Sequence, residues 1–178
     1  MIYVLLGKSC SGKSTILDLL KKDGYKSIIT CTTRPKRENE IDGESYRFLT
    51  NHEFCKLNDF NLLVAKFKAK NGWQYGVNVQ DIAKSENSVI IVEPNGYRDL
   101  INHFGSDNVH GIYLDVPLHL RIDRGLKRND DPKEFIRRLG TDHTDFFGIE
   151  EEVDTIIDSH DKEKVYKIVK KIIDKGGF

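Results

Sequence analysis

Hydrophobic positions along this chain alternate between short continuous runs and one-sided helical stripes. The runs at residues 2–6 and 88–94 are almost uninterrupted, which is typical of strands buried on both faces of a parallel sheet. Residues 14–22 and 161–174 instead repeat apolar side chains at helical spacing, with lysines on the opposite face of the second segment. This alternation of strand and helix predicts an α/β fold.

The rest of the pattern supplies the other elements of such a fold. Three more apolar segments are predicted to be strands, at residues 25–30, 109–114 and 153–159, and a helix is expected near 96–104. With the two continuous runs, they predict a central sheet of five parallel strands covered by helices.

Two segments break the core pattern. In residues 32–83, charged and aromatic residues alternate in short stretches, which indicates an inserted small sheet with strands at YRFLT (46–50) and LLVAKFKAK (62–70). A helix capped by Asn51 is expected between these strands. Residues 117–147 are the most charged part and should be helical on both sides of the NDDP break at 129–132. The core is then expected to comprise residues 1–31, 84–116 and 148–178.

Composition narrows the class of protein. The 178 residues suit one domain, and 28 basic against 28 acidic residues argue against a general nucleic-acid binder. The three cysteines fit no zinc spacing and are interpreted as reduced thiols. No run reaches the roughly 18 apolar residues of a membrane span, and the first run is shorter than a signal-peptide core. We therefore expect a cytoplasmic protein without a membrane partner, monomeric or homodimeric.

The first predicted strand is followed directly by a stretch that matches a phosphate-binding motif. Residues 7–14, GKSCSGKS, match G-x-x-x-x-G-K-[ST], the phosphate-binding P-loop, between a predicted strand and a predicted helix. The glycines let backbone N–H groups turn inward toward an anion, and the following helix adds its positive end. Lys13 can reach the β- and γ-phosphates of ATP, and the Ser14 hydroxyl can bind Mg²⁺. The candidate ATP-binding residues are Gly7, Lys8, Ser9, Cys10, Ser11, Gly12, Lys13, Ser14 and Thr15.

A second stretch, CTTRPKRENEIDGESYRFLT, carries another candidate phosphate site. Arg34 and Arg37 flank a Pro-Lys step, and Tyr46 follows nine residues after the second arginine. Two guanidinium groups and a phenol converging on one point suit a phosphate, because arginine binds phosphate through paired hydrogen bonds. Taken alone, the stretch is equally compatible with a charged surface loop.

Together with the P-loop, this stretch resembles the guanylate kinase family, whose pattern is T-T-R-x-x-R-x-G-E-x-x-G-x-x-Y-x-F. Asn39 stands where the family has a glycine before the glutamate. GWQYG (72–76) looks like the family's G-N-Y-Y-G, and EPNG (93–96) is similar to its D-x-Q-G turn. Arg124, Arg128 and Arg138 lie close to the family's lid arginines, with about one residue deleted before Arg138. The residues in register with the pattern are Thr32, Thr33, Arg34, Arg37, Glu40, Gly43, Tyr46 and Phe48.

The resemblance implies a P-loop NTPase-type three-layer α/β fold with an inserted, mixed NMP-binding subdomain (32–83) and a helical lid (117–147). It also implies transfer of the γ-phosphoryl group of ATP to a nucleoside monophosphate, with Mg²⁺. Glu93 would orient Mg²⁺ through water, or is an ordinary strand-end carboxylate. The residues implied in catalysis are Lys13, Arg34, Arg124, Arg128 and Arg138. The residues implied on the acceptor side are Thr30, Arg34, Arg37, Tyr46, Lys66, Tyr75 and Glu93.

The departures from the family pattern fall where the base is recognised. The family's guanine-binding glutamate, nine residues before the tyrosine, is Lys66 here, while Thr30 keeps the hydroxyl of a family serine. Val77 and Ile91 replace a serine or threonine and an aspartate. A lysine only donates hydrogen bonds, so Lys66 would suit a carbonyl-rich base edge, such as that of a pyrimidine or guanine O6. Alternatively, it points to solvent with Lys68 and Lys70.

Three functions remain open at this point. GMP or dGMP is the favoured acceptor, followed by another nucleotide or by a ribose bisphosphate, since a related kinase of phosphonate metabolism ends its motif in a similar Y-Y-G-V. A guanylate kinase-like binding module without catalysis is the third. Such modules usually lose the P-loop lysine, whereas Lys13 and Ser14 are present here.

Overall fold

The computed structural model describes residues 1–38, 40–69, 72–83, 87–128, 131–158 and 160–176. Three of the sequence features above therefore lie outside the described residues: Asn39, Lys70 and the first half of the break at 129–132.

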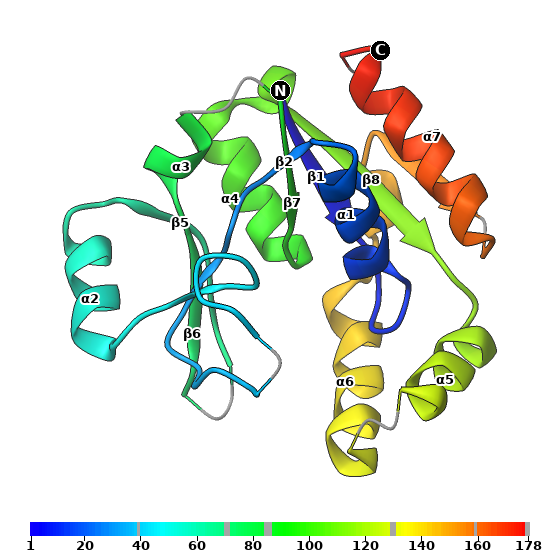
Figure 1. Ribbon diagram of the computed structural model, residues 1–178, viewed down its shortest axis with the longest axis horizontal. Helices are drawn as coiled ribbons and strands as arrows, with labels where there is room; N and C mark the ends of the chain where they lie inside the picture. The colour runs from blue at the N-terminus through cyan, green and yellow to red at the C-terminus, as the bar shows by residue number, and fades with distance from the viewer. Residues whose placement is uncertain (39, 70–71, 84–86, 129–130, 159, 177–178) are drawn as a thin grey trace.

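The central sheet has five parallel strands, as the hydrophobic pattern predicts (Figure 1). Its order is β2-β7-β1-β8-β9, so the first strand of the chain lies in the middle and is buried along its whole length. The strands are β1 (Ile2–Leu6), β2 (Lys26–Ser27), β7 (Ser88–Ile91), β8 (Val109–Asp115) and β9 (Thr155–Asp158).

Helices cover both faces of this sheet and give three layers. Tyr3 and Leu5 of β1 pack with α1 (Lys13–Lys22) and α7 (Lys162–Asp174), which carry the stripes predicted at 14–22 and 161–174. The alternate residues of β1 pack on the other face, with α4 (Pro94–Phe104). The period-two alternation of strand side chains thus divides one apolar run between two cores.

A second, mixed sheet stands to one side of the central sheet (Figure 1). The helix α2 (Asn51–Asp59) lies on the outer face, away from the central sheet, where Phe54 packs against Cys31 and Leu63. The short helix α3 (Val79–Ala83) follows the last strand. The order is β4-β3-β6-β5, formed by β3 (Cys31–Thr32), β4 (Arg47–Phe48), β5 (Leu63–Lys68) and β6 (Gln74–Asn78).

One strand of this sheet contains a bulge. Val64 of β5 pairs with Val77 of β6, and Phe67 pairs with Tyr75, so two residues of β5 lie opposite one residue of β6. Ala65 accommodates the extra residue by taking φ of 50°, in the left-handed region. The bulge changes which side chains of β5 face inward beyond this point.

Two predicted strands are much shorter than the pattern indicated. The segment 25–30 pairs in the central sheet only at Lys26–Ser27, because the chain then crosses to the small sheet. There Cys31 already pairs with Gly76, one residue before the expected start of the insertion. YRFLT forms only the two-residue strand β4.

The predicted cap of α2 is also wrong by one residue. Thr50 caps the helix, its hydroxyl accepting the Glu53 N–H at 3.2 Å while the Glu53 carboxylate accepts the Thr50 N–H at 2.8 Å. This reciprocal capping box satisfies two backbone donors, and only a cap three residues before a glutamate can form it.

The segment 117–147 is helical on both sides of its break, as predicted. It forms α5 (Leu118–Lys127) and α6 (Pro132–Asp145). The strand β8 leads into α5, and a 3₁₀ turn at Ile149–Glu151 follows α6. Another 3₁₀ turn, at Ser106–Asn108, precedes β8. At Gly125 the two helices touch, since a Cβ there would lie 2.3 Å from the Phe135 ring. No helix in the described parts of the chain is long and apolar enough to cross a membrane.

Candidate active site

The P-loop connects β1 to α1 with a tightly curled backbone. Cys10 and Gly12 have φ of 63° and 103°, and Gly12 caps the helix in the left-handed conformation that glycine adopts most readily. The Ser11 N–H donates to the Lys8 carbonyl at 3.1 Å, which closes the turn. Gly7 passes so close to β8 that a Cβ would lie 3.0 Å from the Leu114 carbonyl oxygen. The backbone thus has the concave, glycine-dependent form of an anion-binding loop.

Lys13 is held against this loop. Its ammonium group donates to the carbonyl of Gly7 and, at 3.4 Å, to that of Lys8. Burial lowers the pKa of Lys13, while the carboxylates of Glu93 and Asp142 oppose that shift. The side chain expected to contact phosphate is therefore partly desolvated and lies where the loop would hold the anion.

Two of the three predicted lid arginines lie on the P-loop. The Arg124 Nη1 donates to the carbonyls of Cys10 at 3.3 Å and Ser11 at 3.0 Å. The Arg128 Nη2 is 3.6 Å from the Cys10 sulfur. Arg138, on α6, instead has its Nε 3.6 Å from the Glu134 carboxylate of its own helix. The structure thus brings α5 arginines to the phosphate loop.

A carboxylate that sequence reasoning missed fixes the loop from the other lid helix. Asp142 of α6 accepts the Ser9 N–H at 2.9 Å and the Ser9 hydroxyl at 3.0 Å. Arg121 of α5 donates to the same carboxylate at 3.0 Å, to the Ser9 carbonyl at 3.5 Å and to the Val116 carbonyl at 3.1 Å. Arg121 and Asp142 are only 6% and 7% exposed, so this is a buried ion pair joining both lid helices to the P-loop.

The sequence did contain a signal for this pair. Asp142 follows Phe135 by seven residues and precedes Phe146 by four, which puts a charge on the buried face of the helix. A charge on such a face is almost always paired. The partner, 21 residues away on another helix, was not evident from spacing.

On the acceptor side, Arg34 is buried and has two hydrogen-bond partners for its guanidinium group. It is 5% exposed, and its guanidinium group pairs with Glu40 at 2.6 Å and donates to the Pro35 carbonyl at 2.8 Å. The guanidinium carbon lies 5.3 Å from the centre of the Tyr46 ring and 5.6 Å from that of Phe48. Cation–π contacts and an ion pair therefore hold this arginine at the small sheet.

Tyr46 and Tyr75, both predicted acceptor residues, lie together, with ring centres 6.2 Å apart. Burial, and then the nearby Tyr75, raise the pKa of Tyr46, so the Tyr46 phenol is a neutral hydrogen-bond donor at neutral pH. Arg37 is exposed nearby, and its backbone N–H donates to Glu40 at 2.8 Å. The structure thus brings Arg34, Tyr46 and Tyr75 together, and Arg37, the second arginine of the predicted cluster, lies exposed beside them.

The remaining predicted acceptor residues are more scattered. Thr30 is half-buried just before β3, and its carbonyl accepts the Arg47 N–H at 2.9 Å. Glu93 lies directly before α4. Desolvation by the surrounding protein, with Asp142 and Asp145, raises the pKa of Glu93 against the opposing charge of Lys13. The preceding strand β7 pairs in parallel with β1, so Glu93 lies at the same end of the sheet as the P-loop.

Lys66 lies on the outer side of the small sheet. Its ammonium group donates to the Asn58 side chain of α2 at 3.1 Å, and it borders a hollow of about 260 Å³ with Cys55 and Lys68. Phe67 and Tyr75 line the same hollow, so a role of Lys66 at the base stays a prediction.

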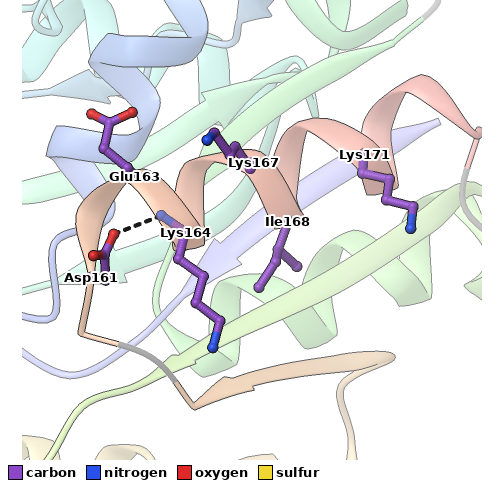
Figure 2. Close-up of a pocket in the computed structure, with 6 residues that line it drawn as sticks. All are labelled: Asp161, Glu163, Lys164, Lys167, Ile168 and Lys171. Atoms are coloured by element: carbon purple, nitrogen blue, oxygen red, sulfur yellow. Dashed lines mark hydrogen bonds between the residues drawn. The ribbon is translucent and has the colours of Figure 1, made fainter.

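A larger hollow, of about 480 Å³, lies along α7 (Figure 2). It is an open stripe of one helix face, where Lys164 and Lys171 extend on either side of Ile168. Asp161 caps this helix by accepting the Lys164 N–H at 2.8 Å. None of the P-loop or acceptor-side residues lines this hollow, so we do not assign the chemistry to it.

The residues present fit ATP with Mg²⁺. The exposed Ser14 lies in the first turn of α1, directly after Lys13, where a hydroxyl can meet a metal ion held by phosphates. Within the described residues, no group of three His, Cys, Asp or Glu side chains can hold a metal ion.

The pair of Arg34 and Glu40 gives a pH-dependent prediction. The hydrogen bond from Arg34 lowers the pKa of Glu40, so the pair stabilises the fold above the ordinary glutamate pKa and loses that contribution as pH falls through the lowered value. Glu40→Gln should reduce the free energy of unfolding by about 1.5–3 kcal/mol at pH 7. The difference from wild type should shrink below about pH 4 in urea unfolding. A difference that stays constant from pH 7 to pH 3 would contradict the ion pair.

The fold and this loop define a P-loop nucleotide-binding protein of the α/β class. The guanylate kinase family model matches residues 1–176, and the chain belongs to the guanylate kinase family.

Individual relatives agree with this assignment. A guanylate kinase of Bartonella henselae is 29% identical over 140 residues, which are 76% of this chain and 63% of that protein. A guanylate kinase of Sulfurimonas denitrificans is 30% identical over 145 residues, which are 77% of this chain and 69% of that protein. The chain thus spans slightly less than two thirds of the Bartonella relative. The crystal structure of guanylate kinase from Anaplasma phagocytophilum superposes on the whole of this chain, and the match covers 86% of the Anaplasma chain. The TM-score is 0.74 at 20% sequence identity, which supports the fold.

Proposed function

We propose that this protein transfers the γ-phosphoryl group of ATP to a nucleoside monophosphate, with GMP or dGMP as the first acceptors to test. The observation that carries the proposal is the meeting of Lys13 with Arg124 and Arg128 at one glycine-dependent loop. Three cations at one anion site suit a reaction that needs charge neutralisation more than covalent chemistry. The family of the chain supplies the acceptor class.

In this proposal the P-loop binds the donor. Lys13 and the loop N–H groups hold the β- and γ-phosphates, and Ser14 contributes one ligand to Mg²⁺, which neutralises phosphate charge when bound. The lid arginines Arg124, Arg128 and Arg138 stabilise the charge of the transferring group. For this, Arg124 must exchange its present carbonyl partners for phosphate oxygens.

The small sheet holds the acceptor. Arg34, Arg37, Tyr46 and Tyr75 would bind its phosphate in line with the donor, which is the main requirement of phosphoryl transfer. Residues 32–83 then act as the acceptor-binding insertion and residues 117–147 as the lid. Closure of the two would exclude water, since water would otherwise accept the phosphoryl group.

Two alternatives remain. Another phosphorylated acceptor is supported by the position of Lys66, which leaves the family's guanine-binding carboxylate without a counterpart. A binding module without catalysis is less well supported, because Lys13 is retained and lies on the loop.

ADP release should be measured with Mg-ATP against GMP, dGMP, AMP, CMP, UMP, dTMP and ribose 1,5-bisphosphate. At least one nucleoside monophosphate should raise ADP release well above the ATPase rate without acceptor. Turnover with ribose 1,5-bisphosphate alone would redirect the function to a sugar phosphate. ATP binding with turnover on none of them would support the binding module.

A further inference from the structure

Four aromatic rings form a row across the inner face of the small sheet. We call them the inner row: Phe67, Tyr75, Tyr46 and Phe48. Successive ring centres are 6.0, 6.2 and 5.9 Å apart, which is within the range of aromatic contacts. Strand pairing agrees, since Phe67 pairs with Tyr75, and Thr32 pairs with both Tyr75 and Phe48. The row therefore belongs to one face of the sheet, opposite α2.

The bulge in β5 decides that Phe67 belongs to this row. In regular pairing from Val64 and Val77 onward, Lys66 would stand opposite Tyr75. The extra residue at Ala65 moves the register by one, so Phe67 takes that place and Lys66 turns to Asn58 of α2. The position next to the acceptor tyrosine is thus aromatic rather than cationic.

The two ends of the inner row differ in chemistry. At one end, Arg34 lies over Tyr46 and Phe48, which suits a phosphate. At the other end, Phe67 is 47% exposed, so much of its ring is open to a ligand. The inward residues of the four described strands include no carboxylate that could accept the N1–H and amino group of guanine. This end offers a flat apolar surface instead of a hydrogen-bond pattern.

We propose that Phe67 is the surface on which the acceptor base stacks, so that this enzyme binds purine nucleoside monophosphates with little discrimination between guanine and adenine. The inference rests on the proposed kinase function. Stacking tolerates any base, because every base has a flat face. Purines, with two fused rings, cover more of the phenyl ring than pyrimidines and should bind more tightly.

The test compares Phe67→Leu and Phe67→Ala with wild type in steady-state turnover of GMP, AMP and CMP. Leucine keeps the apolar volume at this edge strand and removes the ring, so it separates stacking from packing. Wild type should show KM values for GMP and AMP within about tenfold of each other. Both variants should raise these KM values about tenfold or more, with little change in kcat. Phe60→Ala, an exposed aromatic at the end of α2, is the matched control and should leave KM unchanged.

The outcomes separate this inference from the proposed function. Wild type without turnover on any nucleotide would defeat the proposed function. If both Phe67 variants turn over substrate with unchanged KM, only the stacking inference is wrong. The proposed kinase function would then still stand. A strong preference for GMP over AMP that changes in Lys66→Glu but not in Phe67→Leu would mean that the base is read from the α2 side.

Discussion

Replacing Lys13 with alanine is expected to lower phosphoryl transfer by about a hundredfold to a thousandfold while leaving the fold intact. The ammonium group lies on the P-loop carbonyls and is the cation nearest to the expected phosphates. The fold should persist because the substitution leaves the backbone of the loop and of α1 unchanged and removes no apolar side chain from the core. The measurements are kcat with the best acceptor and the midpoint of thermal unfolding.

Lys22→Ala is the control for this variant. Lys22 is an exposed lysine at the far end of the same helix. Lys22→Ala therefore changes the net charge and the composition of α1 by the same amount as Lys13→Ala does. Turnover by Lys13→Ala at the wild-type rate would show that the loop does not bind the reacting phosphates. If Lys13→Ala loses both turnover and the folded state, the loss of activity results from unfolding, and the prediction that the fold stays intact is wrong.

Asp142→Ala is expected to destabilise the protein by about 3–5 kcal/mol. The substitution leaves the Arg121 guanidinium buried without its carboxylate and deprives Ser9 of two hydrogen bonds. A loss of this size is a large part of the stability of an ordinary domain. Urea unfolding, followed by circular dichroism, measures it directly.

Asp145→Ala, an exposed carboxylate one turn further on α6, should change stability by less than about 1 kcal/mol. The double variant Arg121→Met with Asp142→Leu should regain most of the lost stability, because an apolar pair often replaces a buried ion pair without loss. Its KM for ATP should be higher than that of wild type, because Ser9 of the P-loop still lacks the carboxylate that holds it. A single Asp142→Ala variant as stable as wild type would contradict the buried pair.

The sequence determined the architecture of the core and the chemistry of the donor site. Continuous apolar runs specify strands buried on both faces, and helical stripes specify their covering helices, because both patterns reflect local periodicity. The P-loop could be identified because its function depends on consecutive residues, with Gly12 and Lys13 at fixed spacing. The stretch around Arg34 and Tyr46 was recognisable for a similar reason, since its members lie within thirteen residues of one another.

Tertiary structure decided the features that depend on which strands and helices meet. The partnership of Arg121 with Asp142 joins two helices at the loop, and the spacing of the two residues carries no sign of that contact. The face of Lys66 depends on a bulge at Ala65, a residue with no marked preference for the left-handed conformation. Because side chains alternate along a strand, one extra residue exchanges the two faces. The sequence therefore located the segment around Lys66 and Tyr75, and only the pairing of β5 with β6 determined that Phe67, not Lys66, pairs with Tyr75.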